Sequence, residues 1–143
     1  MIILFANQKG GVGKSTLAVL FSNFAVQKRK RKVKVFDMDF QQSLYNKHLN
    51  SDQLENEKLY DVELSSIPGF KSIQNRAADD PKILTVIDLA GKMDDDNLVQ
   101  VFKESELIVC PFCYDEYSVT STFEFCYVVK KVNPSSRIIL VPN

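Results

Sequence analysis

Apolar residues in this chain occur in two kinds of stretch that differ in spacing. Short runs rich in apolar residues occupy positions 2–6, 32–36, 83–87, 107–110 and 137–141. Such runs are typical of strands buried in a parallel sheet. Between them, apolar residues recur at helical spacing over positions 15–28, 97–104 and 117–132. Alternating strands and helices predict an α/β fold of three layers, in which helices flank a mostly parallel sheet.

The stretch between residues 49 and 81 has the weakest pattern. We expect a short strand at 60–64 and a helix near 70–78, joined by irregular chain. The 143 residues contain no repeat and no linker-like tract. The sequence therefore predicts a single domain over residues 1–143.

A glycine-rich loop lies between the first predicted strand and the first predicted helix, where residues 9–16 read KGGVGKST. Its glycines let the backbone turn tightly around an anion, and the following helix adds its positive end. In such loops the lysine, here Lys14, reaches the β- and γ-phosphates, and the Ser15 hydroxyl reaches Mg²⁺. The alternative is a strand–helix turn that binds nothing. The order strand, loop and helix favours phosphate binding.

Carboxylates follow two further predicted strands. Asp37 and Asp39 end the second strand, and near a triphosphate one could hold a metal-bound water while the other orients the attacking water. Asp88 ends the third strand, where phosphate-loop enzymes keep a second Mg²⁺-associated carboxylate. Ala90 and Gly91 then allow the backbone to approach the γ-phosphate closely. Each carboxylate alone could be a solvated strand end, but beside the glycine loop they favour a nucleotide site.

These motifs together resemble the ParA/MinD family of ATPases, and the resemblance implies the three-layer P-loop NTPase fold. Residues 7–16, NQKGGVGKST, look like the family's deviant phosphate loop, and residues 37–43, DMDFQQS, resemble its second signature. Ile87 and Asp88 resemble the third signature, and residues 105–111 look like the strand that ends in proline beside the nucleotide. The sequence before Lys9 is closer to partition ATPases than to MinD.

The resemblance implies a role for each matching residue. As catalytic residues, Lys14 would bind the phosphates, Asp39 would position the attacking water, and Lys9 would reach across a dimer interface to the partner's nucleotide. Mg²⁺ would be held by Ser15, with Asp37 and Asp88 around the metal. The nucleotide would be bound by Gly10, Gly11, Val12, Gly13, Lys14, Ser15, Thr16 and Asn143.

The resemblance also implies an activity: Mg²⁺-dependent ATP binding and slow ATP hydrolysis that switch a homodimer. Such a switch would serve plasmid or chromosome partition, or maintenance of mobile-element DNA, with DNA and a ParB-like adaptor protein as partners. Two other functions stay open. One is a metabolic or cofactor-assembly enzyme on the same scaffold, and the other is a degenerate nucleotide-binding interaction module.

The chain departs from the family pattern in three places. Phe40 stands where the family usually has proline, and residues 89–91 read LAG in place of Thr-Pro-Pro. The sequence ends at Asn143, after the fifth predicted strand, where the family continues with further strands and helices. We therefore expect a fragment or a minimal member, incomplete at its C-terminal side.

Charge and composition limit the kinds of partner and compartment expected for this chain. The 18 basic and 18 acidic residues cancel, so no overall field attracts nucleic acid or membrane. The basic run KRKRK at residues 28–32 is either a patch for nucleic-acid phosphates or a solvated helix end, and its position at a predicted helix C-terminus favours the second. No signal peptide, no membrane-spanning run and no even set of cysteines are present, so we expect a cytoplasmic protein.

Two further patterns have ordinary explanations. Cys110 and Cys113 have the Cys-x-x-Cys spacing of a redox or metal site, but without a second pair we expect buried free thiols. Aromatic residues crowd the following segment, and we expect them to pack the helix onto the core rather than to stack on bases. They are Tyr114, Tyr117, Phe123, Phe125 and Tyr127.

Overall fold

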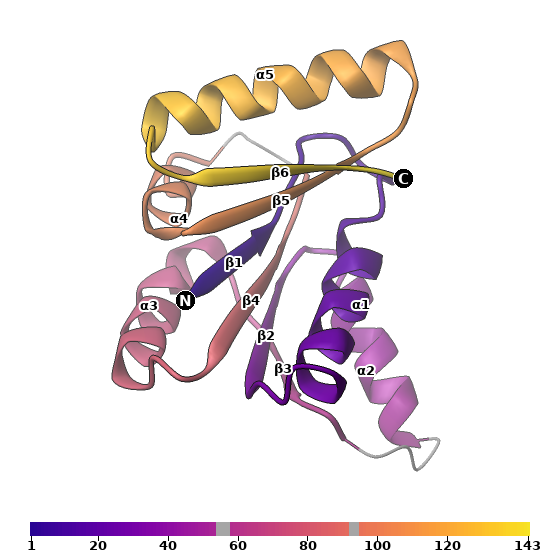
Figure 1. Ribbon diagram of the computed structural model, residues 1–143, viewed down its shortest axis with the longest axis vertical. Helices are drawn as coiled ribbons and strands as arrows, with labels where there is room; N and C mark the ends of the chain where they lie inside the picture. The colour runs from indigo at the N-terminus through magenta and orange to yellow at the C-terminus, as the bar shows by residue number, and fades with distance from the viewer. Residues whose placement is uncertain (54–57, 92–94) are drawn as a thin grey trace.

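The computed structural model describes residues 1–53, 58–91 and 95–143 (Figure 1). The strands are β1 (Ile2–Phe5), β2 (Val33–Met38), β3 (Asp61–Leu64), β4 (Leu84–Leu89), β5 (Leu107–Phe112) and β6 (Arg137–Pro142). The helices are α1 (Lys14–Gln27), α2 (Ser43–Gln53), α3 (Phe70–Asp79), α4 (Leu98–Glu104) and α5 (Glu116–Val132), with the 3-10 turn η1 (Ile67–Gly69) before α3.

The strands form one sheet in the order β3-β2-β4-β1-β5-β6, and every pair is parallel. β1 therefore lies in the middle, hydrogen-bonded to β4 and β5. Because parallel strands present their carboxyl ends at one edge, the segments that follow β1, β2 and β4 meet there. This arrangement confirms the α/β fold predicted from the sequence.

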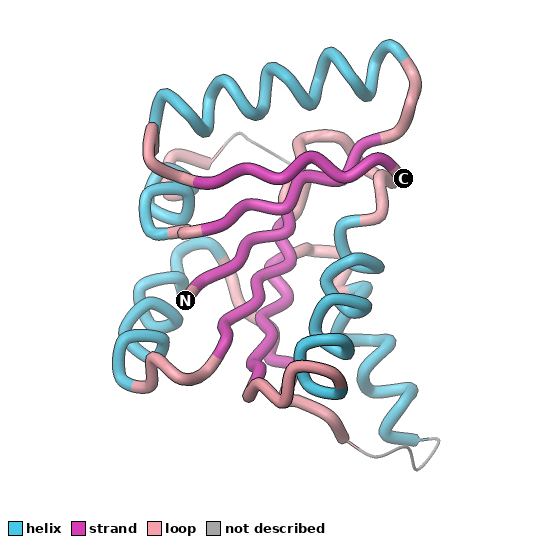
Figure 2. Tube along the Cα trace, viewed as in Figure 1, coloured by secondary structure: helices cyan, strands magenta, loops and turns pink. Residues whose placement is uncertain are grey.

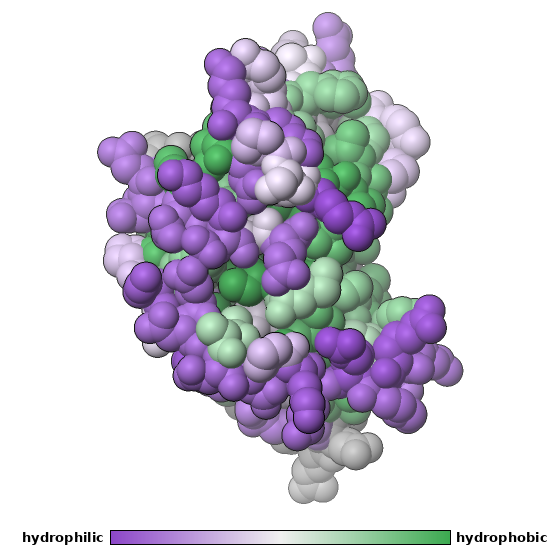
Figure 3. Space-filling model, turned by 60° about the vertical axis from the view of Figure 1, so that its left-hand side comes forward, coloured by the Kyte–Doolittle hydropathy of each residue, from purple (hydrophilic) through white to green (hydrophobic). Residues whose placement is uncertain are grey.

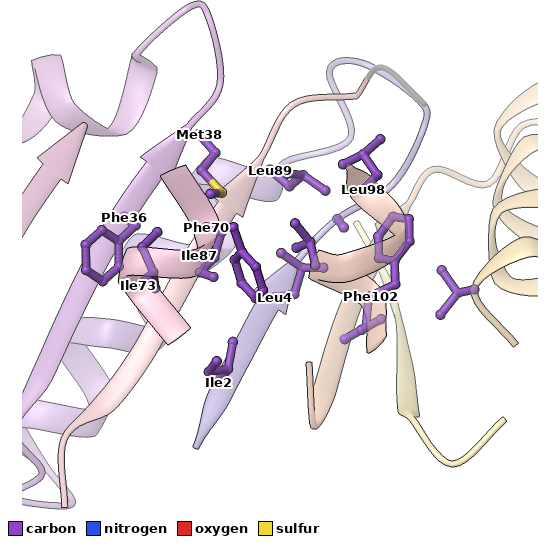
Figure 4. Close-up of a cluster of buried hydrophobic side chains, with 14 of the residues drawn as sticks. Ile2, Leu4, Phe36, Met38, Phe70, Ile73, Ile87, Leu89, Leu98 and Phe102 are labelled. Atoms are coloured by element: carbon purple, nitrogen blue, oxygen red, sulfur yellow. The ribbon is translucent and has the colours of Figure 1, made fainter. Parts of the chain in front are cut away.

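Helices cover both faces of the sheet (Figures 1 and 2). α1 and α2 pack on one face, where Ala18, Ala25 and Leu44 meet inward residues of β1, β2 and β4. α3, α4 and α5 pack on the other face, where Phe70 and Ile73 of α3 lie beside Ile87 (Figure 4). These two apolar clusters pack the helices against both faces of the sheet and so fix the positions from which the loops at its carboxyl edge start.

β2 and β4 run two residues beyond their predicted ends. Met38 and Leu89 still belong to the strands, so Asp37 and Asp88 lie within the sheet, side by side in its register. Both carboxylates are completely buried. The apolar pattern placed the strand ends too early because it treats a buried Asp as the end of a strand.

α2 was not predicted, and its sequence explains why. Leu44 is buried in this helix, whereas Leu49 is 41% exposed. Its first turn is held by Asp37, whose Oδ2 accepts hydrogen bonds from the backbone N–H groups of Leu44 and Tyr45 at 3.1 and 3.0 Å. A cap supplied from another element leaves no signal next to the helix itself.

The surface is mixed in character. On the face in Figure 3, hydrophilic residues predominate and hydrophobic residues show between them. In the part of the chain that the structure describes, no helix is both long and apolar enough to cross a membrane.

Candidate functional site

Two glycines of the loop between β1 and α1 have backbone conformations that favour glycine. The angle φ is +76° at Gly11 and +91° at Gly13, in the left-handed region where a side chain is strained. Gly13 is also the N-cap of α1, and its carbonyl accepts a hydrogen bond from the Leu17 N–H at 2.9 Å. The loop thus leads directly into a helix N-terminus, whose free N–H groups and dipole attract an anion.

The Lys14 side chain folds back into this loop. It is 7% exposed, and its Nζ donates a hydrogen bond to the backbone carbonyl of Lys9 at 3.1 Å. Burial lowers the pKa of Lys14, while the nearby carboxylates of Asp88 and Asp39 act in the opposite direction. A partly desolvated ammonium beside a glycine loop is well placed to give up its hydrogen bond to the Lys9 carbonyl and donate to phosphate oxygens instead.

Asp88 is close enough to Lys14 and Ser15 to interact with both. Neither of its carboxylate oxygens has a hydrogen-bond partner among the described residues. Burial raises the pKa of Asp88 to about 7, with smaller contributions from Asp37 and Asp39; the Ser15 hydroxyl and Lys14 lower it without completing a hydrogen bond of good geometry. An unpartnered buried carboxylate is costly, so this one suits a site that a ligand completes.

Asp37 within β2 and Asp39 just after it have different surroundings. Asp37 accepts hydrogen bonds from the backbone N–H groups of Asp39, Leu44 and Tyr45, all within 3.1 Å. Asp39 is half-buried and faces a cavity, and its Oδ1 accepts from the Gln41 N–H at 2.9 Å. Asp39 is therefore available to a ligand, whereas Asp37 orders the loop and α2. The metal-site role of Asp37 stays a prediction.

A cavity of about 670 Å³ opens at the carboxyl edge of the sheet. It brings together the phosphate loop, the segment after β2 and the segment after β4. Its lining comprises Gln8, Gly10, Gly11, Gly13, Lys14, Ser15, Thr16, Asp39, Phe40, Gln41, Ser43, Lys47, Ala90 and Gly91. Sequence reasoning missed Lys47, because only the unpredicted helix α2 brings it to the cavity. Had the sequence indicated a helix beginning at Ser43, Lys47 would have been expected one turn later on the same side of that helix as Ser43.

Gly91 brings the segment after β4 against the phosphate loop. A Cβ atom at Gly91 would lie 3.1 Å from the carbonyl oxygen of Gln8 and 3.5 Å from Lys14 Nζ. Such spacing leaves little room for a side chain at Gly91. The expected approach of this backbone to a γ-phosphate stays a prediction.

Asn143 contacts the loop from the far end of the chain. Its backbone N–H donates to the carbonyl of Phe112 at 2.9 Å, and its Nδ2 donates to the carbonyl of Val12 at 3.1 Å. The Val12 side chain is itself buried, so Val12 anchors the loop from within. The structure thus places Asn143 against the loop, and a contact between Asn143 and a nucleotide base stays a prediction.

Lys9 lies outside the cavity lining. It borders a second hollow of about 460 Å³ that is otherwise lined by residues of α5, among them Glu116, Tyr117 and Glu124. Its backbone N–H donates to Asn7 Oδ1 at 3.1 Å, and Asn7 Nδ2 donates to Thr122 Oγ1 of α5 at 2.7 Å. The start of the loop is therefore tied to α5, with the Lys9 side chain at the surface between them.

Comparison with protein families gives an assignment for nearly the whole chain. The AAA domain family matches residues 1–138. The chain belongs to this family. Among curated protein sequences, none matches the chain significantly.

Solved structures similar to this AAA domain come from proteins of several functions. A plasmid partition protein of Borrelia burgdorferi has a TM-score of 0.75 at 19% identity, with 99% of this chain and 77% of that chain covered. A chain of the MinC:MinD cell division protein complex of Aquifex aeolicus has a TM-score of 0.70 at 14% identity, with 99% of this chain and 68% of that chain covered. Cobyrinic acid a,c-diamide synthase of Mycobacterium smegmatis, with bound ADP and magnesium, has a TM-score of 0.72 at 16% identity, with 99% and 73% covered. These matches confirm the resemblance to ParA/MinD-type P-loop ATPases in fold.

The basic run of residues 28–32 lies away from this site. It follows the C-terminus of α1, whereas the phosphate loop precedes the N-terminus of that 14-residue helix. The run is exposed, and the Arg29 guanidinium lies 5.5 Å from the centroid of the Phe24 ring. A helix of this length separates the two features by about 20 Å.

The cysteine contact differs from the one suggested by the Cys-x-x-Cys spacing. The buried thiol of Cys110 shares a hydrogen bond with Cys126 of α5, and this contact together with burial raises the pKa of Cys110. Cys113 instead donates its backbone N–H to Ser118 Oγ at 3.0 Å. Within residues 1–53, 58–91 and 95–143, no cluster of His, Cys, Asp and Glu is suited to hold a metal by itself.

Proposed function

We propose that this chain is a cytoplasmic, Mg²⁺-dependent ATPase of the ParA type, whose ATP-bound form is a homodimer. We further propose that it serves plasmid or chromosome partition, or maintenance of mobile-element DNA. One observation carries the proposal. Lys14, Ser15 and Asp39 line a single cavity at the carboxyl edge of the sheet, and all three interact with the buried Asp88, whose carboxylate oxygens have no hydrogen-bond partner among the described residues.

The side chains have distinct tasks in this proposal. Lys14 exchanges the carbonyl of Lys9 for the β- and γ-phosphate oxygens, so ATP binding would free the loop backbone at Lys9. The N-terminus of α1 and the glycine N–H groups bind the remaining phosphate charge. Asp39, half-buried and open to the cavity, orients the attacking water.

The residues present fit a magnesium ion that is bound together with ATP. Asp88 and Ser15 offer hard oxygen donors, and both Asp88 oxygens lack a hydrogen-bond partner in the described part of the chain. Mg²⁺ usually takes one or two protein oxygens and completes its shell with water and substrate phosphates. When bound, the ion would neutralise charge on the β- and γ-phosphates.

The position of Lys9 supports the proposed dimer. Its side chain is exposed beside α5 and does not line the cavity of its own subunit. This placement suits a lysine that reaches the nucleotide of a second subunit, where added positive charge stabilises phosphoryl transfer. The fold shared with a plasmid partition protein supports DNA and a ParB-like adaptor as the partners of such a dimer.

A second candidate is a metabolic or cofactor-assembly enzyme. The cavity extends beyond the phosphate loop to Phe40, Gln41 and Lys47, which leaves room for a group beside the γ-phosphate. The similarity in fold to cobyrinic acid a,c-diamide synthase is about as strong as that to the partition protein. A phosphate acceptor that raises ADP formation in the absence of DNA would favour this candidate.

The direct test is ATP turnover with and without Mg²⁺, compared with the Asp39→Asn variant. We expect slow, Mg²⁺-dependent release of phosphate, reduced at least about tenfold in Asp39→Asn while ATP binding is retained. Absence of ATP binding in the wild type would contradict the proposal. ATP binding without any hydrolysis would instead indicate a degenerate nucleotide-binding module.

A further inference from the structure

The outer face of α5 exposes aromatic residues that the sequence pattern predicted to be packed. Of the five aromatic residues from Tyr114 to Tyr127, only Phe125 is buried. Phe123 and Tyr127 are 61% and 62% exposed. The packing prediction is therefore right for Phe125 and wrong for the other four aromatic residues. The core-facing side of α5 is formed by Ser118, Thr122, Phe125 and Val129.

These aromatic residues belong to one row along the helix. Glu116, Thr120, Phe123, Tyr127 and Lys131 are all exposed and follow one another at intervals of three or four positions. Residues at such intervals share one side of an α-helix. The row is opposite the buried side of α5, so it faces solvent along a helix about 25 Å long. We call these five residues the α5 row.

Charge along the α5 row is ordered from end to end. Glu116 lies in the first turn of the helix and Lys131 in the last, with the two aromatic residues between them. In the described chain, no ion pair involves Glu116 or Lys131; Lys131 Nζ instead lies 4.4 Å from the centroid of the Tyr127 ring. These charges suit the dipole of α5, but the dipole does not account for two exposed aromatic rings.

We propose that the α5 row is a self-association surface, in which α5 of a second copy of this chain packs antiparallel across a two-fold axis near residues 123 and 124. In that register Glu116 faces Lys131 of the second copy, and Thr120 faces its Tyr127. Both ion pairs form at once because a two-fold interface is isologous. The four aromatic rings of the two copies then form the centre, as aromatic residues commonly do in protein interfaces.

The surface is also held rigidly, which reduces the cost of docking. Thr122 on the buried side accepts the hydrogen bond from Asn7, and Asp115 caps α5 by accepting from the Ser118 N–H at 2.9 Å. The proposed association through the α5 row requires no nucleotide and does not depend on the proposed ATPase activity.

Sedimentation equilibrium without nucleotide tests the proposal, at protein concentrations up to about 1 mM. We expect a reversible monomer–dimer equilibrium whose dissociation constant rises at least about tenfold in Phe123→Ser and in Tyr127→Ser. Lys131→Glu and Glu116→Lys should each weaken the dimer, and the double variant should return to within about threefold of the wild type. Leu20→Ser and Phe24→Ser on α1, at residues 57% and 48% exposed, are matched controls that should leave the equilibrium unchanged.

All of these positions are exposed, so circular dichroism and the unfolding transition should be unaltered in each variant. A wild-type chain that stays monomeric at every concentration would overturn the proposal. So would a dimer that the α5 variants leave unchanged, or a double variant that remains as weak as either single one.

Discussion

The Nδ2 atom of Asn143 lies 3.1 Å from the carbonyl oxygen of Val12, to which it donates a hydrogen bond. This bond joins the end of β6 to the phosphate loop across 131 residues of sequence. It restrains the loop at Val12, the residue before the N-cap of α1. We infer that Asn143 orders the loop for its ligand.

Asn143→Ala should therefore weaken nucleotide binding by about three- to tenfold, which is the worth of one hydrogen bond. The fold should be retained, because Asn143 is exposed. Titration with a fluorescent ATP analogue gives the dissociation constant. Ile139→Ala, at an exposed residue of β6, is the control and should bind as the wild type does.

Gly13→Ala should destabilise the protein by about 1–3 kcal/mol, because φ at this residue is +91°. The new methyl group would also collide with Asn143 Nδ2. Gly10→Ala is the matched control, since a Cβ there has no atom within 4 Å. Urea unfolding gives the free energy of unfolding of both variants. Equal losses in the two would show that the positive φ of Gly13 does not contribute to the effect of the substitution.

The raised pKa of Asp88 predicts a dependence of stability on pH. The unfolded carboxyl releases its proton near its ordinary pKa of 3.8, whereas the folded one holds it until about pH 7. Between these values the folded protein binds the extra proton, so the free energy of unfolding should fall as pH rises, by up to about 1.4 kcal/mol per pH unit.

Asp88→Asn cannot titrate and should lack this contribution. The variant should gain stability over the wild type steadily between about pH 4 and pH 7, measured by urea unfolding in Mg²⁺-free buffer. Parallel pH profiles for the two proteins would show that the Asp88 carboxyl is not held protonated.

Lys47 should contribute to ATP binding through its charge. It lines the cavity from α2, so Lys47→Ala should raise the dissociation constant of ATP by about three- to tenfold, more at low salt than at high salt. Lys71→Ala removes an exposed lysine from α3, on the other face of the sheet, and should have no effect. Equal effects of the two variants would indicate only a change in net charge.

The sequence predicted the phosphate loop and its neighbouring elements because their signals are local. Gly11 and Gly13 occupy positions that require glycine, and β1 and α1 have clear apolar patterns on either side. The same local reasoning failed at α2, where the cap is Asp37 and the apolar contact is mainly Leu44.

Other features depend on contacts between distant parts of the chain. The pairing of Asn143 with Val12 follows from the order of strands in the sheet, which the apolar pattern does not encode. The exposure of Phe123 and Tyr127 was missed for a related reason. Helical spacing shows which residues share a side of α5, but not which side faces the core.

Light scattering measures the central claim most directly, namely that ATP switches the chain between monomer and dimer. The protein is sized at about 10 µM with Mg-ADP, with Mg-ATP, and as Lys14→Ala with Mg-ATP. An association through α5 would raise the mass in all three samples alike, so only the difference between them reports the nucleotide. We predict a higher mass for the wild type with Mg-ATP than in the other two samples, which should share one mass. A wild-type chain that binds ATP and keeps the same mass with ADP and ATP would contradict the account.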